Sequence, residues 1–375
     1  MKINVALVGL GFGGAFTEIY REHPCVGEFG IFDIDGRLAG VFARRLGAVR
    51  VYGSFEQILE DKAIDAVHLV TPIPLHAEQT IRVLEAGKHC ACTVPMATSL
   101  GDIRRIVDTV RKTGKKFMMM ETALYTYQFL YVKELLESGA IGRIQFLRGT
   151  HYQDMANWPG YWAGLPPMHY STHAIAPMAV LSGSRISRAV CFGSGTMDQA
   201  LVEKYGNPFP VESALLEFEN GLKAEATRSL FETAREYQEG LFVYGSKASF
   251  EWGFKDSDRP CLTELLPPVD GSRGRRTVTR TVDLPNYHES LPAAIQRFTV
   301  GANYDPLNPQ DSLKAGAGGG HHGSHPHLVN EFVMSVVEDR KPAVDENLAA
   351  NITGAGVCAH ISAMQNGTPV EVPVF

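Results

Sequence analysis

The stretch INVALVGLGFGG at residues 3–14 decides the fold of the first part of this chain. Its apolar first half predicts a buried strand, and the glycines that follow at Gly9, Gly11 and Gly14 have the spacing G-x-G-x-x-G. In such a loop the first glycine permits a tight turn, the second lets the backbone approach a pyrophosphate, and the third allows a helix to pack closely. The spacing alone is a weak signal, but here it follows a strand directly and opens a helix. The loop therefore predicts a dinucleotide site formed by Gly9, Gly11, Phe12, Gly13 and Gly14.

Asp33 follows the second predicted strand, residues 28–32. A carboxylate roughly 20 residues beyond the glycine loop can accept hydrogen bonds from the ribose hydroxyls of a dinucleotide. Because it also repels a 2′-phosphate, NAD is favoured over NADP as the cofactor. The alternative is a plain glycine turn with a helix-capping aspartate, which the strand–loop–helix context disfavours.

Short apolar runs alternate with helical patterns over about the first third of the chain. That alternation predicts a doubly wound parallel sheet with helices on both faces, which is a Rossmann domain. From residue 143 to about residue 267 the pattern changes to strands and hairpin turns, so we expect a large, mostly antiparallel open sheet with helices on one face. Residues 268–325 are rich in Pro, Gly, Ser and Asn and are predicted to be irregular. We predict an α/β fold with an NAD-binding domain at residues 1–121 and a substrate-binding and oligomerisation domain at residues 122–375, whose final helix can pack back on the first domain.

The composition limits the class of protein. A length of 375 residues suits two domains, and 45% hydrophobic and 20% charged residues are ordinary for globular proteins. The net charge of −6 argues against a nucleic-acid surface. No apolar stretch approaches the roughly 20 residues that span a bilayer, and the N-terminus reads as a strand, not as a signal peptide. The six cysteines lack framework or metal-binding spacing, so we expect reduced thiols in a soluble, cytoplasmic protein without a membrane partner.

Several blocks further along follow a known pattern: Thr71-Pro72 with His76, the run from Ala86 into Thr93-Val94-Pro95, and Gly139 to Arg143. They resemble the Gfo/Idh/MocA dehydrogenase family, and the similarity extends over essentially the whole chain. This resemblance implies a Rossmann domain followed by an α/β domain whose open sheet makes oligomers, here a homodimer or homotetramer. It also implies that the cofactor site includes Thr71, Pro72, His76, Thr93 and Pro95.

Two positions depart from the pattern of the family. Val94 stands where the E-K-P motif of the family has a lysine that holds and polarises the substrate hydroxyl, and valine can neither donate a proton nor carry charge. The D-x-x-x-H motif of the family is also altered, with His169 four residues before His173. An alcohol dehydrogenase that used the mechanism of the family would therefore lack, in this chain, two of the residues on which that mechanism depends.

One branch of the family shows the same substitutions. The NAD-dependent glycosidases, such as α-N-acetylgalactosaminidases, are similar at Val94-Pro95, at Glu121 with Tyr125, and at Tyr170-x-Thr172-His173. The block from Gly320 to Gly323 also resembles their G-H-G-G loop. His151 stands where that branch tends to have a tyrosine, and the loop differs after Gly323, so recognition of an N-acetyl group is not implied. NAD-dependent sulfoquinovosidases are an equally good match in chemistry.

The resemblance implies a cycle in which C3 of a sugar is oxidised, the group on C1 is eliminated, water adds, and C3 is reduced again. Such glycosidases do not use the usual pair of carboxylates. Histidines suit the proton transfers, because their ordinary pKa near 6.5 allows protonation and deprotonation at neutral pH. We assign His173 to the reacting hydroxyl, Tyr170 to orienting the sugar or sharing the proton, and His151 to the proton on C2.

Three more residues are candidates for the same site. His169 is expected to face the same cleft as His173, and Glu121 and Tyr125 are expected to lie where the second domain begins. For each of the six residues the alternative is a buried structural polar group.

Two further segments are candidates for contacts with the substrate. Residues 316–327 hold four histidines among glycines, and without a helical ligand pair this favours a substrate-covering loop over a metal site, with His321 and His322 as sugar contacts. Trp158 and Trp162 can stack on a sugar ring, although half-buried packing explains them equally well. Arg228 and Arg235 are candidate partners for an anionic substituent, although charged surface residues near strands are common.

The sequence therefore favours an NAD-dependent glycosidase that leaves the cofactor unchanged. A net sugar or cyclitol dehydrogenase or reductase is the main alternative. A nucleotide-binding sensor without catalysis is disfavoured by the intact glycine loop and the His/Tyr cluster. The sugar, its anomer and the leaving group stay open.

Overall fold

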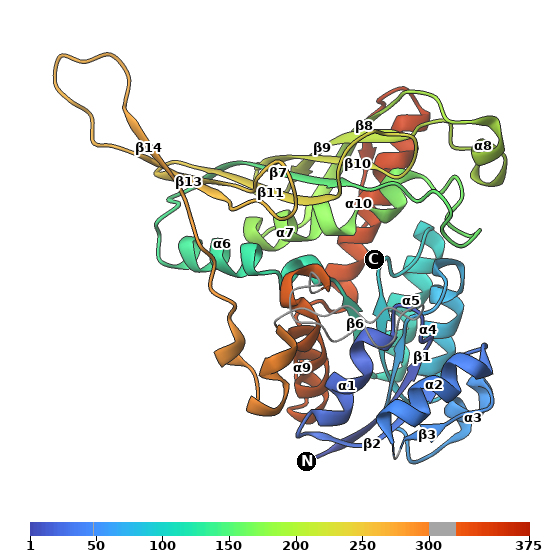
Figure 1. Cartoon of the computed structure of the whole chain (residues 1–375). Coiled ribbons are helices and arrows are strands. Elements are labelled where there is room, and N and C mark those ends of the chain that lie inside the picture. The colour runs from blue at the N-terminus through green and yellow to red at the C-terminus, as the bar shows by residue number, and fades with distance from the viewer. Residues whose placement is uncertain (48, 300–319) are drawn as a thin grey trace. The chain divides into compact units, whose positions relative to one another are not determined.

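Strand β1 (Ile3–Val8) lies in the middle of a six-stranded sheet of order β3-β2-β1-β4-β5-β6 (Figure 1). The computed structural model describes residues 1–47, 49–299 and 320–375. These residues form two compact units. Unit 1 comprises residues 1–126, 286–350 and Phe375, and unit 2 comprises residues 127–285 and 351–374. No helix in these ranges has the length and hydropathy needed to cross a membrane, and all six cysteines are free thiols.

The sheet of unit 1 is parallel throughout, as predicted. Its strand order runs outward from β1 in one direction and then from β4 in the other, which is the Rossmann arrangement with a reversal at the β1/β4 boundary. The further strands are β2 (Val26–Phe32), β3 (Arg50–Val51), β4 (Ala66–Leu69), β5 (His89–Thr93) and β6 (Phe117–Met120). The connecting helices are α1 (Gly14–Glu22), α2 (Gly36–Leu46), α3 (Phe55–Glu60), α4 (His76–Glu85) and α5 (Leu100–Thr113).

Local sequence explains where these helices begin. Asp35 accepts a hydrogen bond from Arg37 N before α2, and Ser99 accepts one from Asp102 N before α5. Side chains of this kind satisfy backbone N–H groups that a helix leaves free at its start. These two side chains therefore determine where α2 and α5 begin.

Helix α9 (Ser324–Val337) joins the core of unit 1 from a distant part of the chain. Leu328, Val329 and Phe332 are buried in the same cluster as Phe16 of α1. The segment 286–350, which the sequence division assigns to the second domain, thus falls in unit 1. It also contains the short helices η4 (His288–Ser290), η5 (Ala293–Thr299) and η6 (Gly320–Gly323).

Unit 2 is built on a nine-stranded sheet of order β14-β13-β12-β11-β7-β10-β9-β8-β15. Every pairing is antiparallel except that of β10 with β7, so the predicted mostly antiparallel sheet is confirmed. The strands are β7 (Ile144–Tyr152), β8 (Ile186–Ser194), β9 (Val211–Phe218), β10 (Lys223–Ser229), β11 (Gln238–Gly245), β12 (Ala248–Glu251), β13 (Cys261–Leu265), β14 (Thr277–Thr281) and β15 (Val370–Glu371). Its helices are α6 (Tyr127–Glu137), η3 (Pro167–Tyr170), α7 (Thr172–Ser182), α8 (Gln199–Tyr205) and α10 (Glu346–Met364), and the boundary between the units falls within α10.

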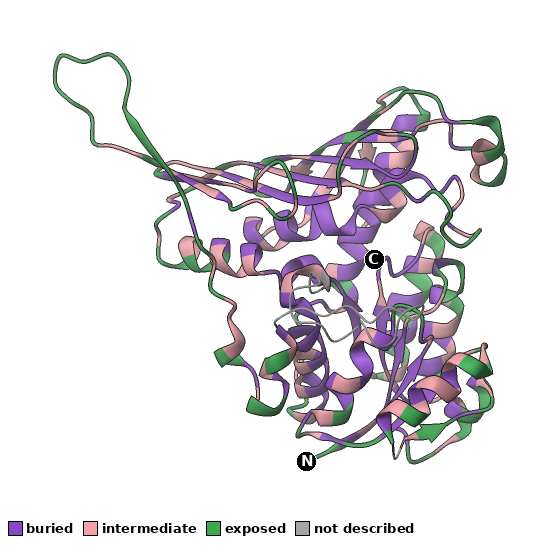
Figure 2. Ribbon diagram, viewed as in Figure 1, coloured by how far each residue is buried: buried purple, intermediate pink, exposed green. Residues whose placement is uncertain are grey.

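Helix α7 covers one face of this sheet and is buried on nearly all sides. A Cβ at Gly149 of β7 would lie 2.1 Å from Ala174 O, so glycine lets the helix approach the strand. One prediction was wrong: within residues 268–325, expected to be irregular, β14 pairs with β13. Every residue of β14 is exposed (Figure 2), so no side chain of this strand needs to be apolar. Its sequence therefore lacks the alternation of apolar and polar residues by which strands are recognised.

Candidate functional site

The dinucleotide loop, residues 9–14, has the geometry that the glycine spacing predicts. Gly9 has a φ of +91°, and a Cβ there would lie 2.2 Å from Val70 O. A Cβ at Gly13 would lie 2.0 Å from Gly9 O, whereas one at Gly11 would meet no atom within 4 Å. Two of the glycines are thus required by packing, and Gly11 leaves open space in front of the loop. The backbone can therefore approach a pyrophosphate at the start of α1, as the cofactor requires.

Asp33 closes this loop from the end of β2. Its Oδ2 accepts a hydrogen bond of 2.6 Å from Leu10 N, and its Oδ1 accepts one of 2.8 Å from Asp35 N. An ionised carboxylate has about four acceptor positions, so capacity remains for ribose hydroxyls. The residues of this loop fit NAD.

The turns after β4 and β5 are joined by His76. Its Nε2 lies 2.7 Å from Thr71 O, and its Nδ1 lies 2.8 Å from Pro95 O. The ring is buried, and desolvation lowers its pKa. Since both nitrogens face carbonyl oxygens, the ring of His76 links the two turns, and its place in the cofactor site stays a prediction.

Those other residues also make contacts within unit 1. Thr71 Oγ1 donates a hydrogen bond to Gln79 Oε1, and Thr93 Oγ1 donates one to Leu69 O. Pro72 directly precedes the short helix η1 (Ile73–Leu75), and the side chain of Val94 is buried. The two turns are therefore held by hydrogen bonds within unit 1.

Glu121 and Tyr125 lie in unit 1, at the end of its first chain segment. Glu121 is fully buried, and its Oε1 accepts a hydrogen bond from Ala123 N. The ring of Tyr125 stacks on His327 of α9 at 6.1 Å, and burial raises the pKa of its phenol. Both residues therefore have local structural contacts in addition to any role in a site.

In unit 2, four ionisable residues form a row across neighbouring strands, which we call the polar row. Strand pairing places Glu212 opposite Arg228, Arg228 opposite His151, and His151 opposite Glu239. Directly paired residues point to the same face of a sheet. Gly149, two residues before His151, faces α7, so the whole row lies on the α7 face. All four residues are less than 5% exposed.

Arg228 holds the polar row together. Its guanidinium donates to Tyr170 O at 2.8 Å, to His151 O at 3.0 Å and to Gln153 Oε1 at 3.0 Å, and it lies 5.3 Å from the centre of the Tyr170 ring. Burial lowers its pKa to about 10, which leaves it charged at neutral pH. Because its donors are directed at protein acceptors, Arg228 does not act as the predicted partner of an anionic substituent. It instead fixes the end of β7 relative to η3.

His151, Tyr170 and His173 come together as predicted, and we call them the His–Tyr cluster. The ring centre of His151 lies 5.0 Å from that of His173 and 6.1 Å from that of Tyr170, and Tyr170 Oη lies 3.5 Å from His173 Nε2. Trp162 packs edge-on against Tyr170 at 4.8 Å, and Trp158, 49% exposed, packs on Trp162. An aromatic wall thus adjoins the cluster, and its outer member is open to solvent.

Sequence reasoning missed Tyr237 and Glu239, which border this cluster. The ring of Tyr237 lies 5.5 Å from that of His151, and its hydroxyl donates to Glu239 Oε1. Burial and the neighbouring Glu239 raise the pKa of Tyr237 well above its ordinary value. Only the register of β11 against β7 brings these residues to His151, and one sequence does not reveal register.

His169 lies in a different environment from the one predicted. Its ring contacts His360 of α10 at 4.9 Å, and among the described residues it makes no ring contact with His173. His360 Nδ1 in turn lies 2.7 Å from Glu212 Oε1. Burial, followed by the repulsion of His360, lowers the pKa of His169 to about 3. In a 3₁₀ helix neighbouring residues point in different directions, which explains why His169 and Tyr170 face different partners.

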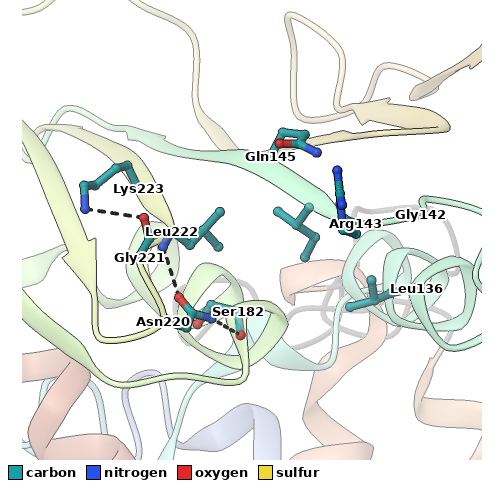
Figure 3. Close-up of a pocket in the computed structure, with 10 residues that line it drawn as sticks. Leu136, Gly142, Arg143, Gln145, Ser182, Asn220, Gly221, Leu222 and Lys223 are labelled. Carbon is teal, nitrogen blue, oxygen red and sulfur yellow. Dashed lines mark hydrogen bonds between the residues drawn. The ribbon is translucent and has the colours of Figure 1, made fainter.

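A separate pocket lies near the first residue of β7 and is lined by Arg143, Gln145, Ser182, Asn220 and Lys223 (Figure 3). Its polar groups largely bond to nearby protein groups: Asn220 Nδ2 donates to Ser182 O, and Lys223 Nζ donates to Glu217 and to Gly221 O. His151 is seven residues further along β7, which is roughly 23 Å at 3.3 Å per residue. This pocket is not part of the His–Tyr cluster.

Family models match both parts of the chain. The model of an oxidoreductase family with an NAD-binding Rossmann fold, Gfo/Idh/MocA, matches residues 3–121, and the model of the C-terminal domain of that family matches residues 129–251. A glycosyl hydrolase family 109 protein of Bacteroides fragilis is 24% identical over 361 residues, which cover 86% of this chain and 74% of that protein. A levoglucosan dehydrogenase of Pseudarthrobacter phenanthrenivorans is 33% identical over 168 residues, which cover 42% of this chain and 43% of that protein.

Solved structures show the same fold. A levoglucosan dehydrogenase in complex with NADH and levoglucosan has a TM-score of 0.77 at 22% identity, with both chains fully covered. The myo-inositol 2-dehydrogenase of Lactobacillus plantarum has a TM-score of 0.73 at 18% identity, again over both full chains.

Proposed function

Because the chain belongs to the Gfo/Idh/MocA family of NAD-binding oxidoreductases, we propose that it cleaves a glycoside through transient oxidation of the sugar, with no net change in NAD. The observation that carries this proposal is the His–Tyr cluster, held by the buried Arg228, in a chain that has Val94 where the family pattern has a lysine. The similarity to a family 109 glycosyl hydrolase over 86% of the chain supports the same proposed function.

Bound NAD supplies the means to take a hydride from a secondary alcohol, here C3 of the sugar, and to return it. His173 accepts the proton of that hydroxyl and later gives it back. Tyr170 lies within reach of His173 and positions the hydroxyl. Histidine suits this reversible transfer because its ordinary pKa lies near neutrality.

His151 removes the proton on C2, which the C3 carbonyl has made acidic. The electrons of that C–H bond form the C1–C2 double bond, and the leaving group departs from C1 with the electron pair of the C–O bond and takes up a proton. Water then adds at C1, and C2 is protonated again. The sum is glycoside plus water giving sugar plus alcohol, so atoms balance and no external oxidant is needed.

The alternative is a net sugar dehydrogenase. It is favoured by one observation, the 33% identity to a levoglucosan dehydrogenase over 168 residues. The two functions differ in what accumulates. The purified protein should be incubated with aryl glycosides, including sulfonated and N-acetylated sugars, while aglycon release and absorbance at 340 nm are followed together. The glycosidase predicts aglycon without accumulating NADH, whereas NADH formed in step with oxidised sugar would establish the dehydrogenase.

We also propose that the chain forms a homo-oligomer through the sheet face opposite α7. Phe192 and Leu215 lie on that face and are 60% and 56% exposed. Large apolar side chains in such positions favour contact with a second copy. Light scattering after gel filtration should give a mass above 41.0 kDa for the wild type and a lower mass for Leu215→Glu.

A further inference from the structure

The short helix η3 carries Tyr170, and two buried residues of the polar row hold it at its two ends. Glu212 Oε2 accepts a hydrogen bond of 2.8 Å from Met168 N near the start of η3. Arg228 Nε donates one of 2.8 Å to Tyr170 O at its end. Both charged residues are 0% exposed, and strand pairing places them opposite each other on β9 and β10. A helix of one turn has few hydrogen bonds of its own, so the position of η3 depends on these two contacts.

Helix α10 packs against the same short helix. A Cβ at Gly356 of α10 would lie 2.4 Å from Met168 O and 2.7 Å from Ser171 Oγ, so the backbone of α10 approaches η3 closely. About one turn further along α10, His360 Nδ1 lies 2.7 Å from Glu212 Oε1. Because a carboxylate only accepts hydrogen bonds, this nitrogen carries the proton. Both oxygens of Glu212 therefore have a donor, one from η3 and one from α10.

The position of η3 matters for the His–Tyr cluster because the contact at the end of η3 is at the limit of hydrogen bonding. Tyr170 Oη lies 3.5 Å from His173 Nε2, whereas hydrogen bonds between such atoms are usually shorter than about 3.2 Å. His173 belongs to α7, which packs directly on Gly149 of β7. A shift of η3 by about 1 Å would therefore change the distance between the two side chains enough to make or break their contact.

We propose that Glu212 is a positioning residue, which holds η3 in place and thereby fixes Tyr170 beside His173. In this role Glu212 acts through Tyr170 and not on the sugar itself. The inference rests on the part that the proposed function gives to Tyr170. The departure of His169 from the family pattern fits the same role, because its ring packs on that of His360 at 4.9 Å and belongs to the support of η3.

A double-mutant cycle with Tyr170→Phe tests this inference. Values of kcat and KM for glycoside cleavage are measured for the wild type, Glu212→Ala, Tyr170→Phe and the double variant. Glu212→Ala should lower kcat about ten- to a hundredfold, since a misplacement of about 1 Å costs on this scale, and should leave KM within about threefold. In the Tyr170→Phe background the same substitution should lower kcat by less than about twofold, because the hydroxyl that it positions is already absent. Losses that multiply in the double variant would overturn the inference.

Two control variants separate positioning from stability. Asn351→Ala removes two buried hydrogen bonds between α10 and Ile186, so it should lower stability and leave the kcat of the folded enzyme unchanged. Glu212→Gln keeps an acceptor for the N–H of η3 and should restore kcat to within about fivefold of the wild type. A loss of kcat in Asn351→Ala equal to that in Glu212→Ala, or no rescue by glutamine, would overturn the inference. If Glu212→Ala does not fold, His360→Asn takes its place in the cycle, with a smaller loss that again disappears in the Tyr170→Phe background.

A signal from Trp162 detects the same displacement without any substrate. Trp162 packs edge-on against Tyr170 at 4.8 Å, and labelling with 5-fluorotryptophan gives one ¹⁹F NMR resonance for each of the three tryptophans. The resonance of Trp162, assigned from Trp162→Phe, should shift in Glu212→Ala and stay in place in Asn351→Ala. An unchanged resonance in Glu212→Ala would overturn the inference. A wild type that cleaves no glycoside, in a protein that shows the shift, would contradict the proposed function alone, so the two failures are distinguishable.

Discussion

The dinucleotide loop of unit 1 depends on backbone groups, whereas the polar row of unit 2 depends on side chains. The loop presents backbone N–H groups and depends on the absence of side chains at Gly9 and Gly13. The row presents ionisable side chains on one sheet face and depends on Arg228 to hold them. The first should therefore be sensitive to added volume and the second to lost charge and hydrogen bonds.

The largest effect expected from this comparison is in the loop. Gly9→Ala would place a methyl group 2.2 Å from Val70 O at a φ of +91°, so the loop must shift. We expect binding of NADH, measured by fluorescence titration, to be lost. Gly36→Ala is the matched control, because a Cβ there meets no atom within 4 Å. Equal NADH affinity in both variants would show that the loop does not depend on its small residues.

The second largest effect is expected at His173, to which the proton transfer is assigned. His173→Gln keeps a polar side chain but removes the titratable nitrogen, and loss of a general acid–base group typically lowers kcat by about 10²–10⁴-fold. NADH affinity should stay within about twofold, since the substitution lies in unit 2. A kcat close to that of the wild type would remove His173 from the reaction.

Arg228→Met tests the polar row through stability. The substitution removes the hydrogen bonds that Arg228 donates to Tyr170 O and His151 O, and breaking a buried charged network typically costs about 3–5 kcal/mol. Urea unfolding should show this loss. Arg273→Met, at an exposed position, should change the free energy of unfolding by less than about 0.5 kcal/mol. Similar stability in both variants would mean that the row does not need its arginine.

The smallest effect concerns acid stability in unit 1. Burial lowers the pKa of His68 to about 3, whereas an unfolded chain has a histidine pKa near 6.5. Between these values the unfolded state binds more protons, so stability falls as the pH drops from about 6.5 towards 3, and by about 2 kcal/mol at pH 5. His68→Leu should therefore lose less stability between pH 7 and pH 5 than the wild type does, as judged by thermal unfolding. Parallel pH curves for the two proteins would contradict this role of His68.

The two regions also differ in how far sequence reasoning reached. The loop could be predicted because Gly9, Gly11 and Asp33 act through local geometry and a fixed spacing between strand and helix. The grouping of His151 with Tyr170 and His173 was predicted through resemblance, and the structure brings them together. Strands β7 to β13 of unit 2 fall within the stretch that was predicted to consist of strands, whereas β14 lies in the stretch that was predicted to be irregular.

What the sequence could not reveal depends on distant pairing. Glu239 and Glu212 are separated from His151 by 88 and 61 positions and reach its row only through strand register. His169 shares a helical spacing with His173, but the 3₁₀ turn directs it to His360. Nothing in the sequence pattern of residues 324–337 shows that α9 packs on the core of unit 1.

The most direct test of the proposed chemistry is the hydrogen on C2 of the sugar. A glycoside that the enzyme cleaves should be incubated in D₂O with NAD-loaded enzyme, and the released sugar examined by NMR. Oxidation at C3 followed by elimination predicts deuterium at C2, retained hydrogen at C3 and no accumulation of NADH. A released sugar that keeps its original hydrogen at C2 would contradict the proposed cycle.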